Sequence, residues 1–356
     1  MSSLRPVRGT PREVYALLSE WQAAPQEPEP LVIETSGSTG TPKHVVLSRR
    51  AMRASATATA LRLGGPGQWL LNLPATYVAG VQVLFRSLLS GIDPVVLEEH
   101  ADFAAATDAM TGWRRYVSLV PTQLTRMLAS PRDVEALRTF DTVLVGGAAV
   151  EPALRRAAAA EDVHVVATYG MSETCGGCVY DGVPLDGVAV KVGGDGRVRI
   201  GGPVLFDRYN GQPGLTAEVM EDGCFLTSDL GRLDDDGRLQ VLGRADDVVV
   251  SGGVKVPGPA VARRLREHPR IQAAEVVGVP DAEWGRRVVA VVVSPSGTPA
   301  RNVPPLDDLR NWVSQVYPRE WAPRQLVRVA EIPLLPNGKV DRLALERVAA
   351  EGTGRP

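Results

Sequence analysis

Two lysines of this sequence, Lys43 and Lys339, lie in segments that could bind phosphate. The chain has 39 basic residues, and only four of them are lysines: Lys43, Lys191, Lys255 and Lys339. A lysine ammonium on its flexible stem can follow an oxygen as charge builds there, whereas the planar guanidinium of arginine favours a fixed two-point contact. Three of the four lysines lie in Gly-rich or Pro/Gly-flanked segments, so the surroundings of Lys43 and Lys339 indicate the chemistry.

Lys43 ends the run TSGSTGTPK, which starts at Thr35 and follows the apolar, mostly β-branched residues 31–33. This pattern predicts a strand that runs into a loop. Two glycines, five hydroxyl residues and a lysine within nine positions supply N–H groups, O–H donors and a cation that can wrap an oligophosphate. Pro42 stands where a Walker loop needs its second glycine, so the loop is of another kind. The alternative interpretation is a Ser/Thr/Gly-rich linker, and the apolar residues 45–47 argue against it.

Length and composition predict an ordinary globular protein. With 356 residues and 44% hydrophobic content, the chain can bury one large core and has the length of two domains. A formal net charge of −2 gives no reason to expect nucleic acid or an anionic membrane as partner. Residues 77–89 form the longest apolar segment, which is too short to span a bilayer. We expect a cytoplasmic location without stable membrane insertion, and three cysteines fit a reducing compartment.

The first half of the chain alternates helical and strand patterns. Thr10 and Glu13 form a capping box before a short amphipathic helix, and Ser48 can cap a second helix that stops at Gly64. A third helix should end at Gly91. Such alternation predicts a mostly parallel sheet covered by helices on both faces. The expected strands are residues 69–73, 94–97, 116–120, 143–145 and 163–167, and the expected helices include 77–90, 123–128 and 153–160.

Beyond residue 188 the pattern changes. Short apolar segments separated by Asp-Gly turns at Asp195, Asp222 and Asp236 predict antiparallel hairpins. After residues 244–247 a new mixture of strands and helices begins. We therefore expect an N-terminal domain over residues 1–243 with a β-rich end at 188–243, a hinge at 244–247 and a small α+β C-terminal domain over 248–356.

Three further segments could bind a ligand. Residues 168–174, TYGMSET, follow a predicted strand, and the carboxyl ends of parallel strands are where open α/β folds bind ligands. There Glu173 could hold a divalent metal and Tyr169 could stack on a base, although an ordinary strand exit is the alternative. Residues 146–149, GGAA, would let a planar ligand approach the backbone. Lys339 lies on an Asn-Gly turn, where a lysine by itself is most often solvated.

Taken together, the segments TSGSTGTPK, YGMSET, TSDLG, GRADD and PNGKVDR resemble the ordered signature of the adenylate-forming superfamily. Its members include acyl-CoA synthetases, the adenylation domains of peptide synthetases and luciferases. The resemblance implies an α/β fold with a large N-terminal domain, a small β-subdomain and a mobile C-terminal domain. It also implies an acid–thiol ligase that uses ATP, Mg²⁺ and CoA, forms an acyl-adenylate and then a CoA thioester.

The resemblance also implies roles for individual residues. Lys339 and Arg244 would act in catalysis together with Glu173, which would also bind magnesium, and Asp229 would accept the ribose hydroxyls. A carboxylate that attacks a polyanion needs cations at the meeting point, which supports these roles. Asp246 would be the hinge, and Gly252, Gly253 and Lys255 would form the CoA side. The remaining nucleotide-binding residues would be Thr35, Ser36, Gly37, Ser38, Thr39, Gly40, Thr41, Lys43, Gly147, Ala148, Ala149, Thr168, Tyr169, Gly170, Met171, Ser172 and Thr174.

Within that superfamily, residues 73–89 and 118–124 and the segment SETCGGCVYDG are similar to the o-succinylbenzoate-CoA synthetases of menaquinone biosynthesis, and the compact length suits actinobacterial-type members. This substrate is a dicarboxylate, so a cation must meet the carboxylate that is not activated. Arg86, a charge within an apolar helix, is the candidate, because a buried charge needs a partner. The alternative is that Arg86 reaches the surface. Tyr77 and Gly146 are the other expected substrate contacts.

Some features depart from the family pattern. Only 34 residues precede Thr35, so we expect a lobe of the large domain to be reduced. His44 replaces a common glycine, and Ala260 and Ala262 replace common glutamates; we expect all three to be tolerated surface changes. Cys175 and Cys178 have the C-x-x-C spacing of zinc or redox sites but lack further ligands nearby, so packing residues are the favoured interpretation. The histidines lack ligand spacing as well; they are His44, His100, His164 and His268.

Rival functions stay open at this point. The enzyme could activate another aryl or fatty acid, or load a carrier protein. A protein of another class, a nucleotide-binding regulator, could keep the fold without the chemistry, although the presence of Lys339, Glu173 and Asp229 argues against it. The oligomeric state is also open, with a homodimer among the options.

Overall fold

The structure, a computed structural model, describes residues 4–35, 43–295, 303–334 and 340–352. Its contacts divide the chain into two compact units. The first comprises Met1–Gly193, Val198–Thr227 and Leu233–Leu239, and the second comprises Gly194–Arg197, Ser228–Arg232 and Gln240–Pro356. The predicted hinge at residues 244–247 lies inside the second unit, and its mobility stays a prediction.

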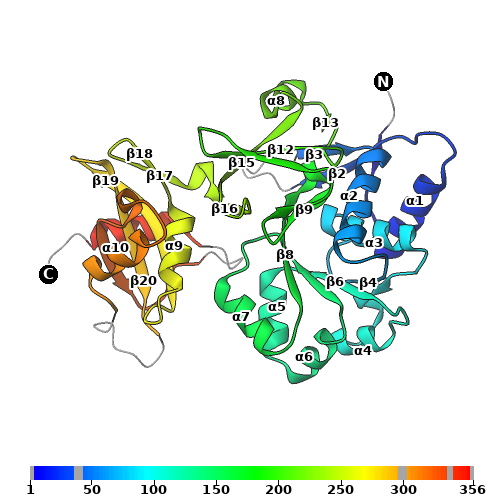
Figure 1. Ribbon diagram of the computed structural model, residues 1–356, viewed down its shortest axis with the longest axis horizontal. Coiled ribbons are helices and arrows are strands. Elements are labelled where there is room, and N and C mark those ends of the chain that lie inside the picture. Colours follow the sequence, from blue (N-terminus) through cyan, green and yellow to red (C-terminus); the bar gives the residue numbers. More distant parts are fainter. Residues whose placement is uncertain (1–3, 36–42, 296–302, 335–339, 353–356) are drawn as a thin grey trace. The chain divides into compact units, whose positions relative to one another are not determined.

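A seven-stranded sheet forms the centre of the first unit (Figure 1). In spatial order its strands are β10 (Val183–Pro184), β9 (Gly176–Tyr180), β8 (Val165–Met171), β7 (Thr142–Val145), β6 (Arg115–Leu119), β4 (Gln68–Leu71) and β5 (Val95–Val96). From β8 to β5 all neighbours are parallel, and β9 and β10 add antiparallel pairs. The predicted mostly parallel sheet is confirmed. Its short β-branched runs suit strands that are buried on both faces.

Helices cover both faces of this sheet. Trp69 and Leu71 of β4 belong to the core shared with the first three helices, whereas Leu70 between them belongs to the core on the other face. Among the described residues, no helix combines the length and apolar character that a membrane crossing needs. The helices on the first face are α1 (Pro11–Ala23), α2 (Arg49–Arg62) and α3 (Val78–Ser90), and those on the second are α4 (Phe103–Asp108), α5 (Pro121–Leu128), α6 (Pro131–Leu137) and α7 (Pro152–Ala160).

The predicted N-terminal caps of α1 and α2 and the predicted end of α3 are confirmed. Thr10 and Glu13 form the capping box of α1, and the Ser48 side chain accepts a hydrogen bond at the start of α2. Gly91 ends α3 in the left-handed conformation with φ of 69°. Tyr77 precedes α3 as its N-cap residue, so the helix begins one residue later than predicted.

A second sheet of four strands packs on the opposite side of the first three helices. Its strands are, in order, β1 (Arg5–Pro6), β2 (Leu31–Thr35), β3 (Lys43–Leu47) and β13 (Arg208–Tyr209). β2 and β3 are antiparallel, and their register places Thr35 opposite Lys43. The two ends of the predicted phosphate loop therefore lie side by side.

The hairpins predicted beyond residue 188 are present. Asp222 and Gly223, with φ of 49° and 75°, form the two-residue turn of one of them. The boundary between the units passes through three of these strands, β12, β15 and β16. The elements of this region are β11 (Ala189–Val192), β12 (Arg197–Gly201), α8 (Pro213–Val219), β14 (Met220–Glu221), β15 (Cys224–Leu233) and β16 (Leu239–Arg244).

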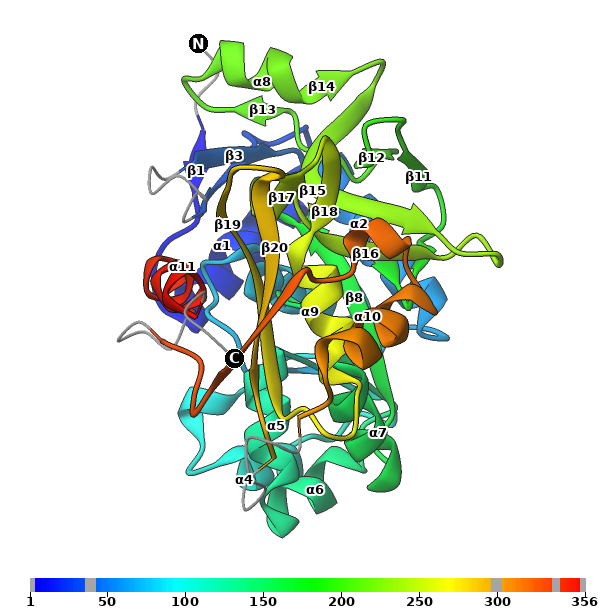
Figure 2. The same ribbon diagram turned by 90° about the vertical axis from the view of Figure 1, so that its left-hand side faces the viewer.

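The second unit has its own sheet. Figure 2 shows α11 (Arg342–Glu351) on one side of β19 (Ala273–Asp281) and β20 (Gly285–Val293), with α9 (Gly258–Arg266) and α10 (Leu306–Ser314) on the other. Alternate valines of the two strands accordingly belong to two separate apolar cores. The other elements are β17 (Val248–Ser251), β18 (Val254–Pro257) and β21 (Gln325–Val329), with single helical turns at η1 (Leu97–Glu99), η2 (Ser172–Thr174), η3 (Ala245–Asp247) and η5 (Arg319–Trp321).

Two expectations from the sequence are wrong. The strand predicted over residues 163–167 does not end at residue 167, since β8 continues through Met171 in an antiparallel pairing with β9. Ala260 and Ala262 were expected on the surface, but they are 0% and 1% exposed. Both lie on α9, where Ala260 packs against Leu230 and Leu242, so a glutamate at that position would place its charge in an apolar core.

Candidate active site

Lys43, Tyr209 and Glu173 lie together in the first unit; we call them the Lys43–Tyr209–Glu173 cluster. The Tyr209 hydroxyl donates a hydrogen bond to Oε1 of Glu173 at 2.6 Å. Lys43 Nζ lies 5.2 Å from the centroid of the Tyr209 ring, which is a cation–π distance. A predicted phosphate cation and a predicted metal ligand thus share one tyrosine.

Sequence reasoning missed Tyr209. Its strand, β13, lies beside β3 (Figure 1), although the two are far apart in the chain, and the register places Tyr209 opposite Val45. No local motif marks this tyrosine, because its position depends on a strand pairing between distant segments. The side chain is 2% exposed, and burial, then the charge and hydrogen bond of Glu173, raise the pKa of its hydroxyl well above the ordinary value.

The turn η2 holds Glu173 in place. The Thr174 hydroxyl accepts a hydrogen bond from the Met171 N–H at 2.9 Å and contacts the carbonyl of Gly176 at 2.7 Å. Thr174 is fully buried, so its side chain serves the turn, and Ser172 is 8% exposed. The Glu173 carbonyl accepts from the Phe206 N–H at 2.9 Å, which ties the turn to the segment that carries Tyr209.

The residues of this cluster fit a magnesium ion brought in with ATP. One Glu173 oxygen accepts from Tyr209, and its other oxygen has no hydrogen-bond partner among the described residues. Three or more metal-ligating side chains do not gather anywhere in the described part of the chain. A single carboxylate is nevertheless what Mg²⁺ requires when the phosphates of its substrate supply further oxygens.

Two glycines shape the exit of β7. A Cβ on Gly146 would lie 2.4 Å from the Thr168 hydroxyl oxygen on the neighbouring strand, so only glycine allows this approach. Gly147 has φ of 78°, and it is exposed together with Ala148 and Ala149. The predicted adenine-site segments, one at the end of β7 and one in β8, are therefore adjacent, with the backbone of the first open to a ligand.

Arg86 is largely buried, at 7% exposure. Its guanidinium carbon lies 5.0 Å from the centroid of the Trp69 ring. Its Nε is buried without a hydrogen-bond partner, and no acidic side chain among the described residues pairs with it. Tyr77, at the start of the same helix, is 54% exposed. Arg86 is thus a buried cation whose anionic partner is absent from the described part of the chain.

The second unit holds the remaining predicted residues. Arg244 is the last residue of β16 and pairs with Asp246 at 3.5 Å, and Asp247 pairs with Arg342 at 3.1 Å. Asp229 lies half-buried in β15. These contacts place the predicted hinge residue Asp246 next to a residue expected to contact the nucleotide.

Gly252 and Gly253 form the tight turn between β17 and β18. Both have positive φ, 57° and 80°, which is what a two-residue hairpin turn requires. The Gly252 N–H donates to the Trp284 carbonyl at 2.9 Å, and a Cβ on Gly252 would lie 2.7 Å from the Trp284 ring.

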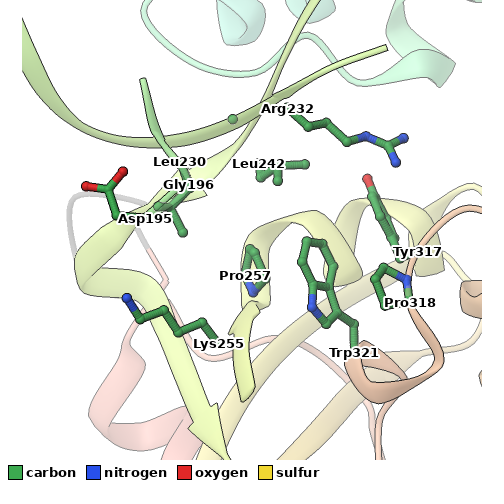
Figure 3. A pocket seen from close by; sticks show the side chains of 11 residues that line it. Asp195, Gly196, Leu230, Arg232, Leu242, Lys255, Pro257, Tyr317, Pro318 and Trp321 are labelled. Carbon is green, nitrogen blue, oxygen red and sulfur yellow. The ribbon is translucent and has the colours of Figure 1, made fainter. Parts of the chain in front are cut away.

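Lys255 follows this turn at the wall of a pocket of about 330 Å³. Figure 3 shows Lys255 and Asp195 at one end, Arg232 and Tyr317 at the other, and Trp321 between them. Arg232 lies over the Tyr317 ring, 5.0 Å from its centroid, and donates to the Val316 carbonyl at 3.2 Å. The pocket therefore offers an apolar wall with a cation near each end.

Several predicted residues fall outside the described ranges. They are Ser36, Gly37, Ser38, Thr39, Gly40, Thr41 and Lys339. Lys43 and Thr35, which flank the first group, are described.

The other sequence signals lie in ordinary surroundings. Cys175 and Cys178 are fully buried, and burial raises the pKa of Cys178 to about 12. Such thiols stay protonated and unreactive near neutral pH. His44 lies half-exposed opposite Glu34, with 3.6 Å between Nε2 and the carboxylate oxygen.

Comparisons with known proteins agree with this arrangement. The AMP-binding enzyme family matches residues 13–210, and the AMP-binding enzyme C-terminal domain matches residues 261–339. A probable 2-succinylbenzoate–CoA ligase of Mycobacterium tuberculosis is 44% identical over 324 residues, 89% of this chain and 84% of that protein. The 2-succinylbenzoate–CoA ligase of Listeria monocytogenes is 30% identical, over 95% of this chain and 73% of its own.

A solved structure is similar as well. The o-succinylbenzoate CoA synthetase of Bacillus subtilis, in complex with the acyl-adenylate intermediate, superposes with a TM-score of 0.70 and 26% identity. The match covers 89% of this chain and 68% of that one.

Proposed function

Because the chain belongs to the AMP-binding enzyme family, we propose that it joins o-succinylbenzoate to CoA through an acyl-adenylate. One carboxylate of the substrate attacks the α-phosphorus of ATP and releases pyrophosphate. The CoA thiol then attacks the acyl carbon and releases AMP. The relatives named as 2-succinylbenzoate–CoA ligases support this reaction, and the buried, unpaired Arg86 is the observation in this chain that carries the choice of a dicarboxylate.

In the first half-reaction, charge neutralisation is the main task of the protein. Lys43 and residues 35–41 would hold the phosphates, and Glu173 would hold the Mg²⁺ that comes with ATP. Bound Mg²⁺ neutralises negative charge on the phosphate oxygens. The remaining adenylation residues are Lys339 at the α-phosphate, Asp229 and Arg244 at the ribose, and Gly147, Ala148, Ala149, Thr168, Tyr169, Gly170 and Met171 at the adenine.

Arg86 selects the substrate. A guanidinium with a buried, unpaired Nε is unfavourable until an anion reaches it. The carboxylate of o-succinylbenzoate that is not activated supplies this anion, while the Trp69 ring supports the guanidinium from its other side. Tyr77 and Gly146 complete the proposed acyl site.

In the second half-reaction the segment after Asp246 turns and presents Gly252, Gly253 and Lys255 to CoA. Two facts support this proposal. The glycine turn lets a ligand approach the backbone closely, and Lys255 borders the pocket of Figure 3, whose apolar wall suits the pantetheine arm of CoA.

The test is product formation from ATP, Mg²⁺, CoA and a panel of carboxylic acids, with AMP and pyrophosphate measured alongside. A strong preference for o-succinylbenzoate supports the proposal. AMP release with a different aryl or fatty acid would keep the mechanism and replace the substrate. Acyl transfer to a carrier protein, without a free CoA thioester, would indicate a carrier-loading enzyme. ATP binding without turnover of any acid would indicate a nucleotide-binding regulator.

Two expectations stay predictions with tests of their own. Cell fractionation tests the cytoplasmic location, and sedimentation analysis tests the homodimer.

A further inference from the structure

We propose that Tyr209 is a positioning residue that keeps Glu173 and Lys43 apart and ready for their separate ligands. Its hydroxyl orients the Glu173 carboxylate toward Mg²⁺, and its ring supports the Lys43 ammonium for the phosphates. This inference rests on the proposed function, because it assigns the cluster to a magnesium–ATP site.

The Glu173 carboxylate lies next to an uncharged partner. Its hydrogen-bond donor at 2.6 Å is a neutral phenol, not an arginine or a lysine. A neutral donor fixes the orientation of a carboxylate without cancelling its charge, and it occupies one oxygen only. The full negative charge of Glu173 and its second oxygen thus stay available to a cation. Hydrogen bonds that orient metal ligands in this way commonly govern metal affinity.

The Lys43 ammonium contacts the ring of Tyr209. A lysine and a glutamate that share a site would ordinarily form an ion pair, which would consume both charges. Among the described residues no ion pair joins Lys43 to Glu173, and instead Lys43 Nζ lies over the Tyr209 ring at 5.2 Å from its centroid. The ring offers the ammonium a weak attraction, of roughly 0.5–1 kcal/mol at exposed sites, that a phosphate can replace easily.

Neighbouring residues hold Tyr209 firmly in place. Its backbone pairs with β3 opposite Val45, and the N–H of Tyr209 donates to the Thr216 hydroxyl at 3.0 Å. Its ring packs against Phe206, with 4.9 Å between the centroids. The N–H of Phe206 in turn donates to the carbonyl of Glu173 at 2.9 Å. Tyr209 is therefore fixed relative to both residues that it serves.

Two substitutions separate the hydroxyl from the ring. Tyr209→Phe removes the hydrogen bond and keeps the ring beneath Lys43, whereas Tyr209→Leu removes both. ATP binding is measured by calorimetry with and without Mg²⁺, and the Mg²⁺ concentration for half-maximal adenylate formation is measured in parallel. We expect Tyr209→Phe to weaken Mg²⁺-dependent ATP binding about tenfold, with ATP binding in the absence of Mg²⁺ unchanged. Tyr209→Leu should weaken ATP binding in both conditions.

Tyr180→Phe is the matched control. Tyr180 is also 2% exposed, and its hydroxyl hydrogen-bonds the Thr59 hydroxyl at 3.0 Å, away from the cluster. This control should lose stability without any change in the response to Mg²⁺.

Two outcomes would overturn the role of Tyr209: a wild-type response to Mg²⁺ in Tyr209→Phe, or equal losses in Tyr209→Phe and Tyr180→Phe. Wild-type adenylate formation is measured first, because its absence would instead overturn the proposed function and this inference with it.

Discussion

Two cations of the first unit lie over aromatic rings in opposite circumstances. Lys43 lies 5.2 Å from the centroid of Tyr209, and Arg86 lies 5.0 Å from that of Trp69. Lys43 is half-buried, and the Tyr209 hydroxyl donates a hydrogen bond to the Glu173 carboxylate. Arg86 is buried and has no acidic partner in the described part of the chain.

The difference indicates which ligand each cation serves. At Lys43 the protein supplies the lysine cation, the Glu173 carboxylate and the Tyr209 side chain that contacts both. A site for a metal-bound polyphosphate requires such a cation and such a carboxylate. At Arg86 it supplies the cation alone. A buried charge is costly unless it is paired, so an unpaired arginine in an apolar helix is best explained by a partner that arrives with the substrate. The following predictions test whether Lys43 serves ATP and Arg86 serves the acid substrate.

Replacement of Lys339 should have the largest effect. Lys339→Ala removes the cation proposed for the α-phosphate, and loss of one such group costs about 10²–10³ in rate. Adenylate formation should fall by that factor, whereas conversion of preformed acyl-adenylate and CoA to the thioester should continue at the wild-type rate. Rapid-quench assays of each half-reaction measure this, and equal losses in both would refute the separation of roles.

Replacement of Lys43 should affect ATP and leave the acid unaffected. Lys43→Met removes one charge-assisted contact to phosphate, worth roughly 1.5–3 kcal/mol, so KM for ATP should rise about tenfold or more. KM for o-succinylbenzoate should stay unchanged. Lys191→Met, on an exposed position of β11, is the control and should change neither value. A rise in KM for the acid would remove the contrast with Arg86.

The smallest effect is expected for Gly91→Ala, at the end of the helix that carries Arg86. Gly91 ends α3 with φ of 69°, and a Cβ there would meet nothing within 4 Å. Gly91→Ala should therefore cost only the backbone strain, about 1 kcal/mol, measured by urea denaturation. KM values for both substrates should stay unchanged, since the substitution lies beyond the last turn of the helix.

Much of the fold follows from local patterns. The capping box at Thr10, the left-handed Gly91 and the Asp-Gly turns each depend on a few adjacent residues, so the sequence could predict them. The continuation of β8 through Met171 depends instead on its antiparallel partner β9, which no local rule announces. The same holds for Ala260 and Ala262, whose burial depends on distant leucines and valines.

The residues of the candidate site also differ in how far the sequence could identify them. Lys43 and Glu173 lie in recognisable motifs and could be identified from them. Tyr209 contributes through a strand pairing with β3, so only the structure brings it to the cluster. Arg86 is intermediate: its apolar neighbours predicted burial, but the lack of an internal acidic partner is visible only in three dimensions.

The most direct test of this account compares o-succinylbenzoate with 4-oxo-4-phenylbutanoate, which lacks the ring carboxylate, in the wild type and in Arg86→Met. Arg49→Met serves as the control, because the Arg49 guanidinium is largely buried and bonded to backbone carbonyls. If Arg86 binds the second carboxylate, the wild type and Arg49→Met should prefer o-succinylbenzoate by about 10- to 100-fold in kcat/KM. Arg86→Met should lose most of this preference with KM for ATP unchanged. An undiminished preference in Arg86→Met would contradict the account.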